Sequence, residues 1–294
     1  MTNPLSTILR SKTKTVEISR SLPTVMIGER INPTGRKKVQ EALAAGKYDI
    51  VRKDAIEQVR AGAQVLDINA GVPGLDERAL LTAIMQEVMA VVDVPLCIDT
   101  ANPEALEAAL KLYEGKPLIN SVNGERRSLQ TVLPLAKAYH AAVIGLCMDD
   151  NGIPRTAEGR LSAAAKIIQQ ATQMGIPIED IVIDPLAMAL SADSQSARIA
   201  LQTIELVVKE FGVNITVGAS NISYGMPDRP YLNSAFIAMA IHAGLTCPIT
   251  NPLVVENTTA ILAGDLARGK DEDGMRWIRA YRQRQRAAAG AAAD

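Results

Sequence analysis

The sequence predicts an α/β protein built as a (β/α)₈ barrel, the TIM-barrel architecture. Eight short apolar runs, rich in Val, Ile and Leu, recur along the 294-residue chain, and a turn and a helical pattern follow each. The runs are too short for globular helices and have the composition of strands buried on both faces. A doubly wound open sheet, the alternative, would carry a GxGxxG turn after the first strand, and GERINPTG (28–35) does not match it. Alternation of this kind over roughly 250 residues favours a single closed barrel.

The elements follow one another in a regular order. Strands are expected at 24–30, 65–70, 95–100, 117–123, 142–149, 181–185, 215–221 and 247–252. Amphipathic helices are expected at 49–63, 75–92, 102–115, 128–141, 157–175, 196–212, 230–244 and 257–269. Asn102 is the expected N-cap of its helix, since Pro103 follows at the first helical position. We therefore expect one barrel at 24–270.

The two ends of the chain lie outside this repeat. Residues 1–23 are expected to be an N-terminal extension that crosses the closed bottom of the barrel or forms an arm. Residues 271–294 are expected to be a C-terminal helix that frays into an alanine-rich tail. The N-terminal segment has no apolar core of signal-peptide length.

Composition excludes several classes of function. The formal net charge is −1 and aromatic residues make up 3% of the chain, so neither a basic surface nor a base-stacking surface for nucleic acid is indicated. No apolar run reaches the length of a membrane span, so no membrane partner is expected. Three cysteines without CxxC spacing indicate buried thiols and a cytoplasmic protein.

Polar residues stand at the end of every predicted strand, where barrel active sites lie. A single Asp or Asn in such a place is as often a turn former or a helix cap. Eight polar strand ends at one rim need a shared explanation, because a buried carboxylate without a partner is costly. Together they predict a polar, mostly uncharged ligand with several N–H donors. The residues are Glu29, Arg30 and Asn32, then Asp67 and Asn69, Asp99, Asn120 and Asn123, Asp149, Asp184, Asn221 and Asn251.

Other reaction chemistries lack their residues. The two histidines, His140 and His242, fall at the ends of predicted helices, so neither a zinc site nor a Ser–His–Asp triad is expected. No strand ends in lysine for a Schiff base, no phosphate-binding P-loop is present, and no metal-ligand spacing predicts a metal. Asp99 and Asp184 are formally a carboxylate pair for glycoside hydrolysis, but the scarcity of aromatic residues disfavours a sugar site.

Seven motifs in chain order carry a family resemblance. IGERIN, LDINAG, CIDT, INSVN, GLCMD, IDP and GASNIS occur one per strand, between about residues 24 and 270. Together they resemble the pterin-binding barrels, and specifically the methyltetrahydrofolate:corrinoid protein methyltransferases. The folate domain of cobalamin-dependent methionine synthase is similar. The resemblance implies a barrel of the pterin-binding type.

The resemblance also implies roles for the strand-end residues. Asn221 matches the family asparagine that hydrogen-bonds N5 of the pterin, and it is the expected catalytic residue. An amide suits this place because it stabilises charge at N5 without carrying charge itself. Asp99, Asn120 and Asp184 are expected to bind the pterin ring, Asp67, Asn69, Glu29 and Asn32 to line the pocket, and Arg229 to touch the pterin or its glutamate tail, unless it forms a surface ion pair.

The implied reaction moves a methyl group between N5 of tetrahydrofolate and the cobalt of a corrinoid. The substrate is tetrahydrofolate or 5-methyltetrahydrofolate. A separate corrinoid protein is the expected partner because the sequence has no DxHxxG motif. A homodimer is also implied. The preferred direction is from the methyl-corrinoid to tetrahydrofolate in a demethylation pathway.

Three alternatives remain open. One is the opposite direction, in which methyltetrahydrofolate methylates a corrinoid iron–sulfur protein for acetyl-CoA synthesis. Another is a folate-binding barrel that transfers nothing. The third, a dihydropteroate synthase-like enzyme, is disfavoured because that family has an Arg-Lys pair after the glycine and serine of strand seven, where GASNIS has Asn221.

Overall fold

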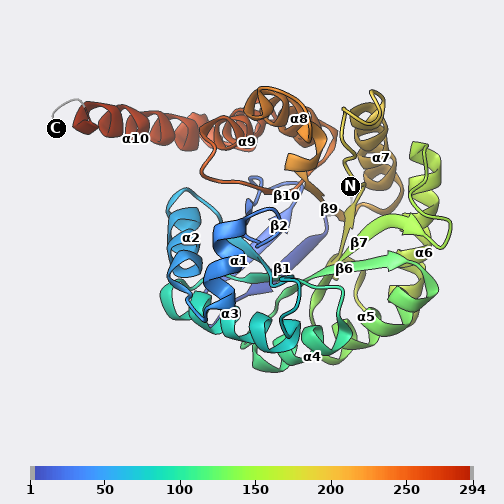
Figure 1. The fold of residues 1–294 in the computed structure, drawn as a ribbon. Helices are drawn as coiled ribbons and strands as arrows, with labels where there is room; N and C mark the ends of the chain where they lie inside the picture. Colours follow the sequence, from blue (N-terminus) through green and yellow to red (C-terminus); the bar gives the residue numbers. More distant parts are fainter. Residues whose placement is uncertain (1–3, 292–294) are drawn as a thin grey trace.

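Eight parallel strands form a closed barrel in the computed structural model, which describes residues 4–291 and the side chains of residues 4–286 (Figure 1). The order around the barrel is β10-β3-β4-β5-β6-β7-β8-β9. The predicted (β/α)₈ architecture is therefore confirmed. The strands are β3 (Ile27–Ile31), β4 (Val65–Asn69), β5 (Leu96–Asp99), β6 (Leu118–Gly124), β7 (Ala142–Asp149), β8 (Ile181–Asp184), β9 (Asn214–Gly218) and β10 (Cys247–Thr250).

The strand predicted at 215–221 ends three residues earlier than expected. β9 ends at Gly218, and the chain then turns through a 3-10 segment, η2 (Ala219–Ser223). Asn221 therefore lies on a turn above the barrel rather than at a strand end. The chain leaves the strand there because the Asn221 carbonyl accepts a hydrogen bond from the amide of Tyr224 (3.1 Å), which closes a helical turn.

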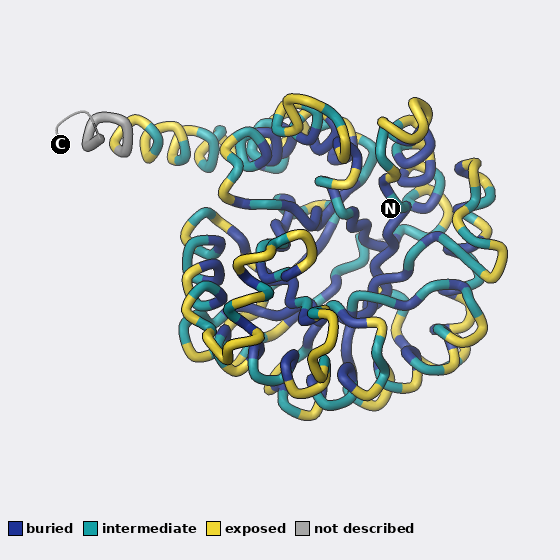
Figure 2. Tube along the Cα trace, viewed as in Figure 1, coloured by how far each residue is buried: buried dark blue, intermediate teal, exposed yellow. Residues whose placement is uncertain are grey.

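Helices surround the barrel and bury their inner faces against the strands (Figure 2). All eight predicted helices are present, and Asn102 caps its helix by accepting from the amides of Glu104 and Ala105. The helices are α2 (Asp49–Arg60), α3 (Glu77–Val91), α4 (Pro103–Leu112), α5 (Arg126–Ala138), α6 (Ala157–Gln173), α7 (Ser196–Phe211), α8 (Arg229–Ala243) and α9 (Val255–Ala267), with a 3-10 turn η1 (Ile178–Asp180) before β8. A short additional helix, α1 (Lys37–Ala44), follows β3 and was not predicted.

An antiparallel hairpin covers the N-terminal end of the barrel. It consists of β1 (Ser6–Arg10) and β2 (Thr15–Ser19). Leu9 and Ile18 are fully buried in the cluster that fills the lower barrel, which also includes Leu118 from β6. The Thr7 and Asn214 side chains join the hairpin to β9 through an Asn214 Nδ2 to Thr7 Oγ1 hydrogen bond of 2.9 Å.

The chain continues past α9 through a 3-10 turn, η3 (Glu272–Gly274), into helix α10 (Met275–Ala291), which extends away from the barrel (Figure 1). Asp271 caps α10 by accepting from the amides of Arg276 and Trp277, both at 2.9 Å. The end of the predicted alanine-rich tail, residues 292–294, lies outside the described residues. None of the helices described is long and apolar enough to cross a membrane.

Candidate active site

Three neighbouring strands bring a carboxylate–amide network to the C-terminal mouth of the barrel. Asn69, Asp99 and Asn120 are register partners on β4, β5 and β6, so their side chains stand side by side. Asn69 Nδ2 donates to Asp99 Oδ2 at 3.0 Å, and Asn120 Nδ2 donates to Asp67 Oδ1 at 3.1 Å. The peptide between Asn120 and Ser121 is cis. Within the described chain no side chain donates to Asp99 Oδ1, which leaves this oxygen for a ligand.

The two carboxylates of this network hold protons unusually well. The pKa of Asp67 is raised to about 8, mainly by burial and secondly by the charge of Asp99. The hydrogen bond from Asn120 acts in the opposite direction. Burial raises the pKa of Asp99 to about 6, against the hydrogen bond from Asn69, while the charge of Glu77 raises it further. Near neutral pH the pair therefore carries closer to one charge than two, and N–H donors from a ligand would stabilise the ionised form.

Asp184 forms a second part of the rim, at the end of β8. Its carboxylate is buried and accepts from the Leu186 amide at 2.7 Å. Burial raises its pKa to about 6, although the amides of Leu186 and Gly218 and the charge of Arg160 lower it. Arg160 Nη1 donates to the carbonyls of Pro185 and Leu186, at 2.8 and 2.7 Å. These contacts hold Leu186 in the left-handed region (φ +63°), a strained backbone typical of binding loops.

A third group ties β3 to the turn that carries Asn221. Ser220 Oγ donates to Glu29 Oε1 at 2.7 Å. Arg229 donates to the Ser220 carbonyl through Nη2 (2.9 Å) and to Ser223 Oγ through Nε (3.0 Å). Burial raises the pKa of Glu29, while the Ser220 hydrogen bond and the charges of Arg229 and Arg30 lower it. The turn is thus held from both sides, and Arg229 makes no ion pair with any described residue.

Asn221 itself is exposed and folds back over β9. A Cβ at Gly218 would lie 2.8 Å from Asn221 Nδ2, so a side chain there would displace the exposed Asn221 amide from its place over β9. No other described residue accepts from or donates to the Asn221 amide. The amide is therefore free to meet a ligand above the barrel.

Some predicted rim residues serve the loops instead. Asn32 Oδ1 accepts from the Thr34 amide at 2.8 Å, which is a turn of the kind that Asn commonly forms. The same turn chemistry occupies three other strand-end side chains, those of Asn123, Asp149 and Asn251. Asn69 and Asp184 accept from the amides of Gly71 and Leu186 in the same way, but they also take part in the network and the rim described above. A loop turn therefore does not by itself exclude a strand-end residue from the mouth.

Two supporting residues were missed from the sequence. Ser220 and Arg160 fix the loops after β9 and β8, but serine and a helical arginine give no pattern that distinguishes them; only the position of Ser220 beside Asn221 was a signal. A cavity of about 410 Å³ opens beside Asp99 and Asn120 and is also lined by Ser121. In the part of the chain that the structure describes, no group of three His, Cys, Asp or Glu side chains is placed to hold a metal.

The fold is an eight-stranded barrel whose C-terminal mouth, the usual place of a barrel active site, carries buried carboxylates and amides that can accept hydrogen bonds. Residues 28–251 match the family described as "Pterin binding enzyme", and the chain belongs to that family. The resemblance inferred from the seven strand motifs is confirmed.

Two relatives show where in this family the chain lies. It is 31% identical over 265 residues to the methylcorrinoid:tetrahydrofolate methyltransferase of Eubacterium limosum, covering 88% of this chain and 96% of that protein. It is 30% identical over 249 residues to methionine synthase of Mycobacterium tuberculosis, covering 80% of this chain but only 21% of that protein. The chain thus spans about a fifth of methionine synthase and nearly all of the first relative.

Solved structures share the fold. Dihydropteroate synthase of Yersinia pestis superposes with a TM-score of 0.65 at 18% identity, covering 90% of this chain and 99% of that one. The Xanthomonas albilineans dihydropteroate synthase with 4-aminobenzoic acid superposes with a TM-score of 0.66 at 18% identity, covering 90% of this chain and 98% of that one. At this identity the similarity establishes the barrel alone.

Proposed function

We propose that the chain is a methyltransferase that moves a methyl group between N5 of tetrahydrofolate and the cobalt of a corrinoid on a separate protein. The observation that carries this is similarity over 96% of a relative named for this reaction. The carboxylates and amides at the mouth support it as a pterin site. The proposed direction, as in that relative's name, is from methyl-corrinoid to tetrahydrofolate in a demethylation pathway.

The pyrimidine edge of a pterin offers N–H donors, which ionised carboxylates accept. We assign this contact to Asp99 and Asp184, with Asn120 completing the ring recognition. Asn69 holds the Asp99 side chain in place, and Asp67 holds that of Asn120, through the hydrogen bonds described above. Glu29 and Asn32 lie on the adjoining strand and its loop, and Arg229 keeps the turn above them in position.

Asn221 is proposed to act at N5. In the direction given, the N5 lone pair attacks the methyl carbon, the electrons of the cobalt–carbon bond remain on cobalt, and N5 then loses its proton to water. The Asn221 carbonyl oxygen can accept from N5–H as positive charge builds there. In reverse, its N–H can donate as the methyl group leaves. A free, exposed amide suits both directions because it needs only to rotate.

Binding of tetrahydrofolate is the first test of this proposal. An anaerobic calorimetric titration of the purified protein with tetrahydrofolate should show saturable binding at about micromolar concentration, a common range for small-molecule sites. A folded protein that releases no heat and binds no pterin would contradict the pocket assignment.

Pterin affinity is expected to depend on pH. Since burial raises the pKa of Asp99 and Asp184 to about 6, both are protonated in acid and cannot accept two N–H donors. The affinity for tetrahydrofolate should therefore rise as pH increases through about 6.

The stability of the ligand-free protein should change with pH in the opposite direction. Asp99 and Asp184 bind protons more tightly in the folded protein, with a pKa of about 6, than in the unfolded chain, with a pKa of 3.8. The stability that this difference contributes is fully present below pH 3.8 and is lost as pH rises through about 6.

Calorimetry from about pH 5 to about pH 8, in buffers of different ionisation enthalpy, measures both the affinity and the protons released. Asp149→Asn is the matched control, since Asp149 only closes a loop turn. An affinity that stays flat over this range would contradict the assigned carboxylates.

Exposed apolar side chains around the mouth support docking of a corrinoid protein there. Leu75, Ile153, Met188 and Tyr224 are exposed on the loops after β4, β7, β8 and β9. The C-terminal face therefore presents apolar surface beside the polar pocket. Such a rim fits a partner that must exclude water while it presents its cofactor.

Removing two of these side chains should weaken docking and leave pterin binding unchanged. Ile153→Ser/Met188→Ser is expected to raise the KM for a methylated corrinoid protein about tenfold, the scale of one interface hot spot. The affinity for tetrahydrofolate should not change. Leu266→Ser removes an exposed leucine from the last turn of α9 and serves as the control. Equal effects of both variants on KM would place docking elsewhere.

The same proposal includes a homodimer in the cytoplasm. Tyr231 and Met239, both exposed on α8, support a contact between copies on that side. Three buried free thiols support a reducing compartment. Sedimentation equilibrium of the full chain measures the oligomeric state directly.

A further inference from the structure

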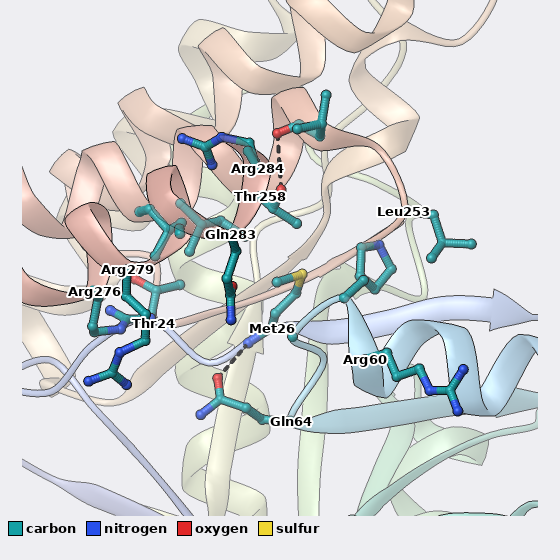
Figure 3. A pocket seen from close by; sticks show the side chains of 17 residues that line it. Thr24, Met26, Arg60, Gln64, Leu253, Thr258, Arg276, Arg279, Gln283 and Arg284 are labelled. Carbon is teal, nitrogen blue, oxygen red and sulfur yellow. Dashed lines mark hydrogen bonds between the residues drawn. The ribbon is translucent and has the colours of Figure 1, made fainter. Parts of the chain in front are cut away.

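A second cavity lies outside the strands, between the C-terminal end of α2 and helix α9, with α10 along its third side (Figure 3). We call it the α9–α10 groove. Its volume is about 600 Å³, within the usual range for a small-molecule site. None of its lining residues belongs to the carboxylate–amide network at the mouth, so the proposed methyl transfer does not explain it.

Helix α10 turns a polar face toward this groove. Arg276, Arg279, Gln283 and Arg284 recur at helical spacing and all line it (Figure 3). By contrast, Ile278 is exposed on the same helix. A helix docked only for stability buries its apolar stripe. The orientation of α10 instead presents guanidinium groups to a cavity.

The charge in the groove is one-sided. Four arginines line it, whereas no carboxylate does so in the part of the chain that the structure describes. The whole chain is nearly balanced, with 31 basic and 32 acidic residues, so this concentration is local. Arg276 is neutralised by the buried Asp265, at 2.7 Å, whereas Arg60, Arg279 and Arg284 form no ion pair with any described residue, although the charge of Arg279 also acts on Asp271.

The groove is also partly preorganised. Asp265 is fully buried and accepts from both the amide and the hydroxyl of Thr24, so Arg276 is held on a fixed anchor. The Arg284 guanidinium lies 5.7 Å from the ring centroid of Trp277. Apolar side chains, including those of Met26 and Leu253, supply a surface on which a carbon skeleton can lie.

From these contacts we propose that the α9–α10 groove is a second ligand site, for a small organic anion with at least two carboxylate or phosphate groups. Guanidinium groups bind both kinds of group through paired hydrogen bonds. Three guanidinium groups without an ion pair, one on α2 and two on α10, match a ligand with more than one anionic group. A groove of about 600 Å³ is large enough for a small molecule of this kind.

Trp277 makes the site measurable because it is the single tryptophan of the chain. An anion that engages Arg284 should alter the Trp277 emission. We would titrate the full-length protein with citrate and, separately, with tripolyphosphate, at constant ionic strength set with NaCl. Saturation with one probe and not the other identifies the anionic group. Arg60→Gln/Arg279→Gln should raise the apparent Kd by about tenfold or more, since each lost charged hydrogen bond costs on that scale.

Arg198→Gln is the matched control, because Arg198 is an exposed arginine on α7 with no assigned role. It should change the Kd by less than about twofold, as distant sites act independently. The proposal would be overturned if the titrations did not saturate, or if Arg198→Gln raised the Kd for the anion as much as the double variant does. Either result would indicate general charge attraction. The affinity for tetrahydrofolate should stay unchanged in all variants. A failure of the groove proposal can therefore be distinguished from a failure of the proposed methyl transfer.

Discussion

Asn221→Ala is expected to slow methyl transfer by about 10²-fold or more, the scale for removal of one hydrogen-bonding group that meets charge developing in the transition state. The affinity for tetrahydrofolate should fall far less. The reason is structural: the Asn221 amide is exposed, has no described partner, and stands on a turn that Glu29 and Arg229 hold through Ser220. Its removal therefore leaves the pocket intact and takes away only the group that meets N5.

The measurement is a single-turnover rate at saturating tetrahydrofolate, together with a calorimetric Kd. Asn251→Ala is the control, since Asn251 also follows a barrel strand but its Oδ1 accepts from the Leu253 amide. A variant at Asn221 that transfers methyl groups as fast as the wild type would show that the assigned role is wrong. Equal losses in rate and affinity would instead make Asn221 a binding residue.

Asp184→Asn is expected to weaken tetrahydrofolate binding by about 10- to 10²-fold, because a hydrogen bond to a charged group contributes about 1.5–3 kcal/mol. The amide can still accept from the Leu186 amide, so the loop after β8 keeps its hydrogen bond. Because burial already disfavours the charge on Asp184, the neutral variant should be no less stable than the wild type.

Weaker tetrahydrofolate binding without a loss of stability would show that Asp184 serves ligand recognition and not folding. Calorimetry measures the affinity and thermal unfolding measures the stability. Asp99→Asn is expected to act in the same direction, since Asp99 has an oxygen free for the ligand. Unchanged affinity in both variants would remove the argument that these carboxylates recognise the pterin ring.

Local patterns predicted most of the barrel because each βα unit carries its own signal. The eight strands and eight surrounding helices overlap the expected segments, and their ends differ from the expected ones by at most three residues. The β1–β2 hairpin was not predicted, since its strands are short and mix polar with apolar residues; only the buried neighbours of Leu9 and Ile18 explain it. Helix α1 was missed for a similar reason, as eight residues are too few for a clear helical period.

The site was predicted less completely than the fold. Polar strand ends located the rim, but the sequence could not separate Asp99, which leaves an oxygen free, from Asn32, which closes a loop turn. That difference depends on three-dimensional hydrogen bonding. The placement of Asn221 on η2, beyond the end of β9, depends likewise on a turn that strand composition does not reveal.

One anaerobic reaction would show methyl transfer between the two proposed substrates. The purified protein is mixed with tetrahydrofolate and methylcobalamin as the methyl donor, and the cob(I)alamin spectrum and 5-methyltetrahydrofolate are followed together. Both should form in equal amounts, at a rate that depends on Asn221. If the protein binds tetrahydrofolate but forms neither product with methylcobalamin or with any methylated corrinoid protein, the chain is a folate-binding barrel and not a methyltransferase.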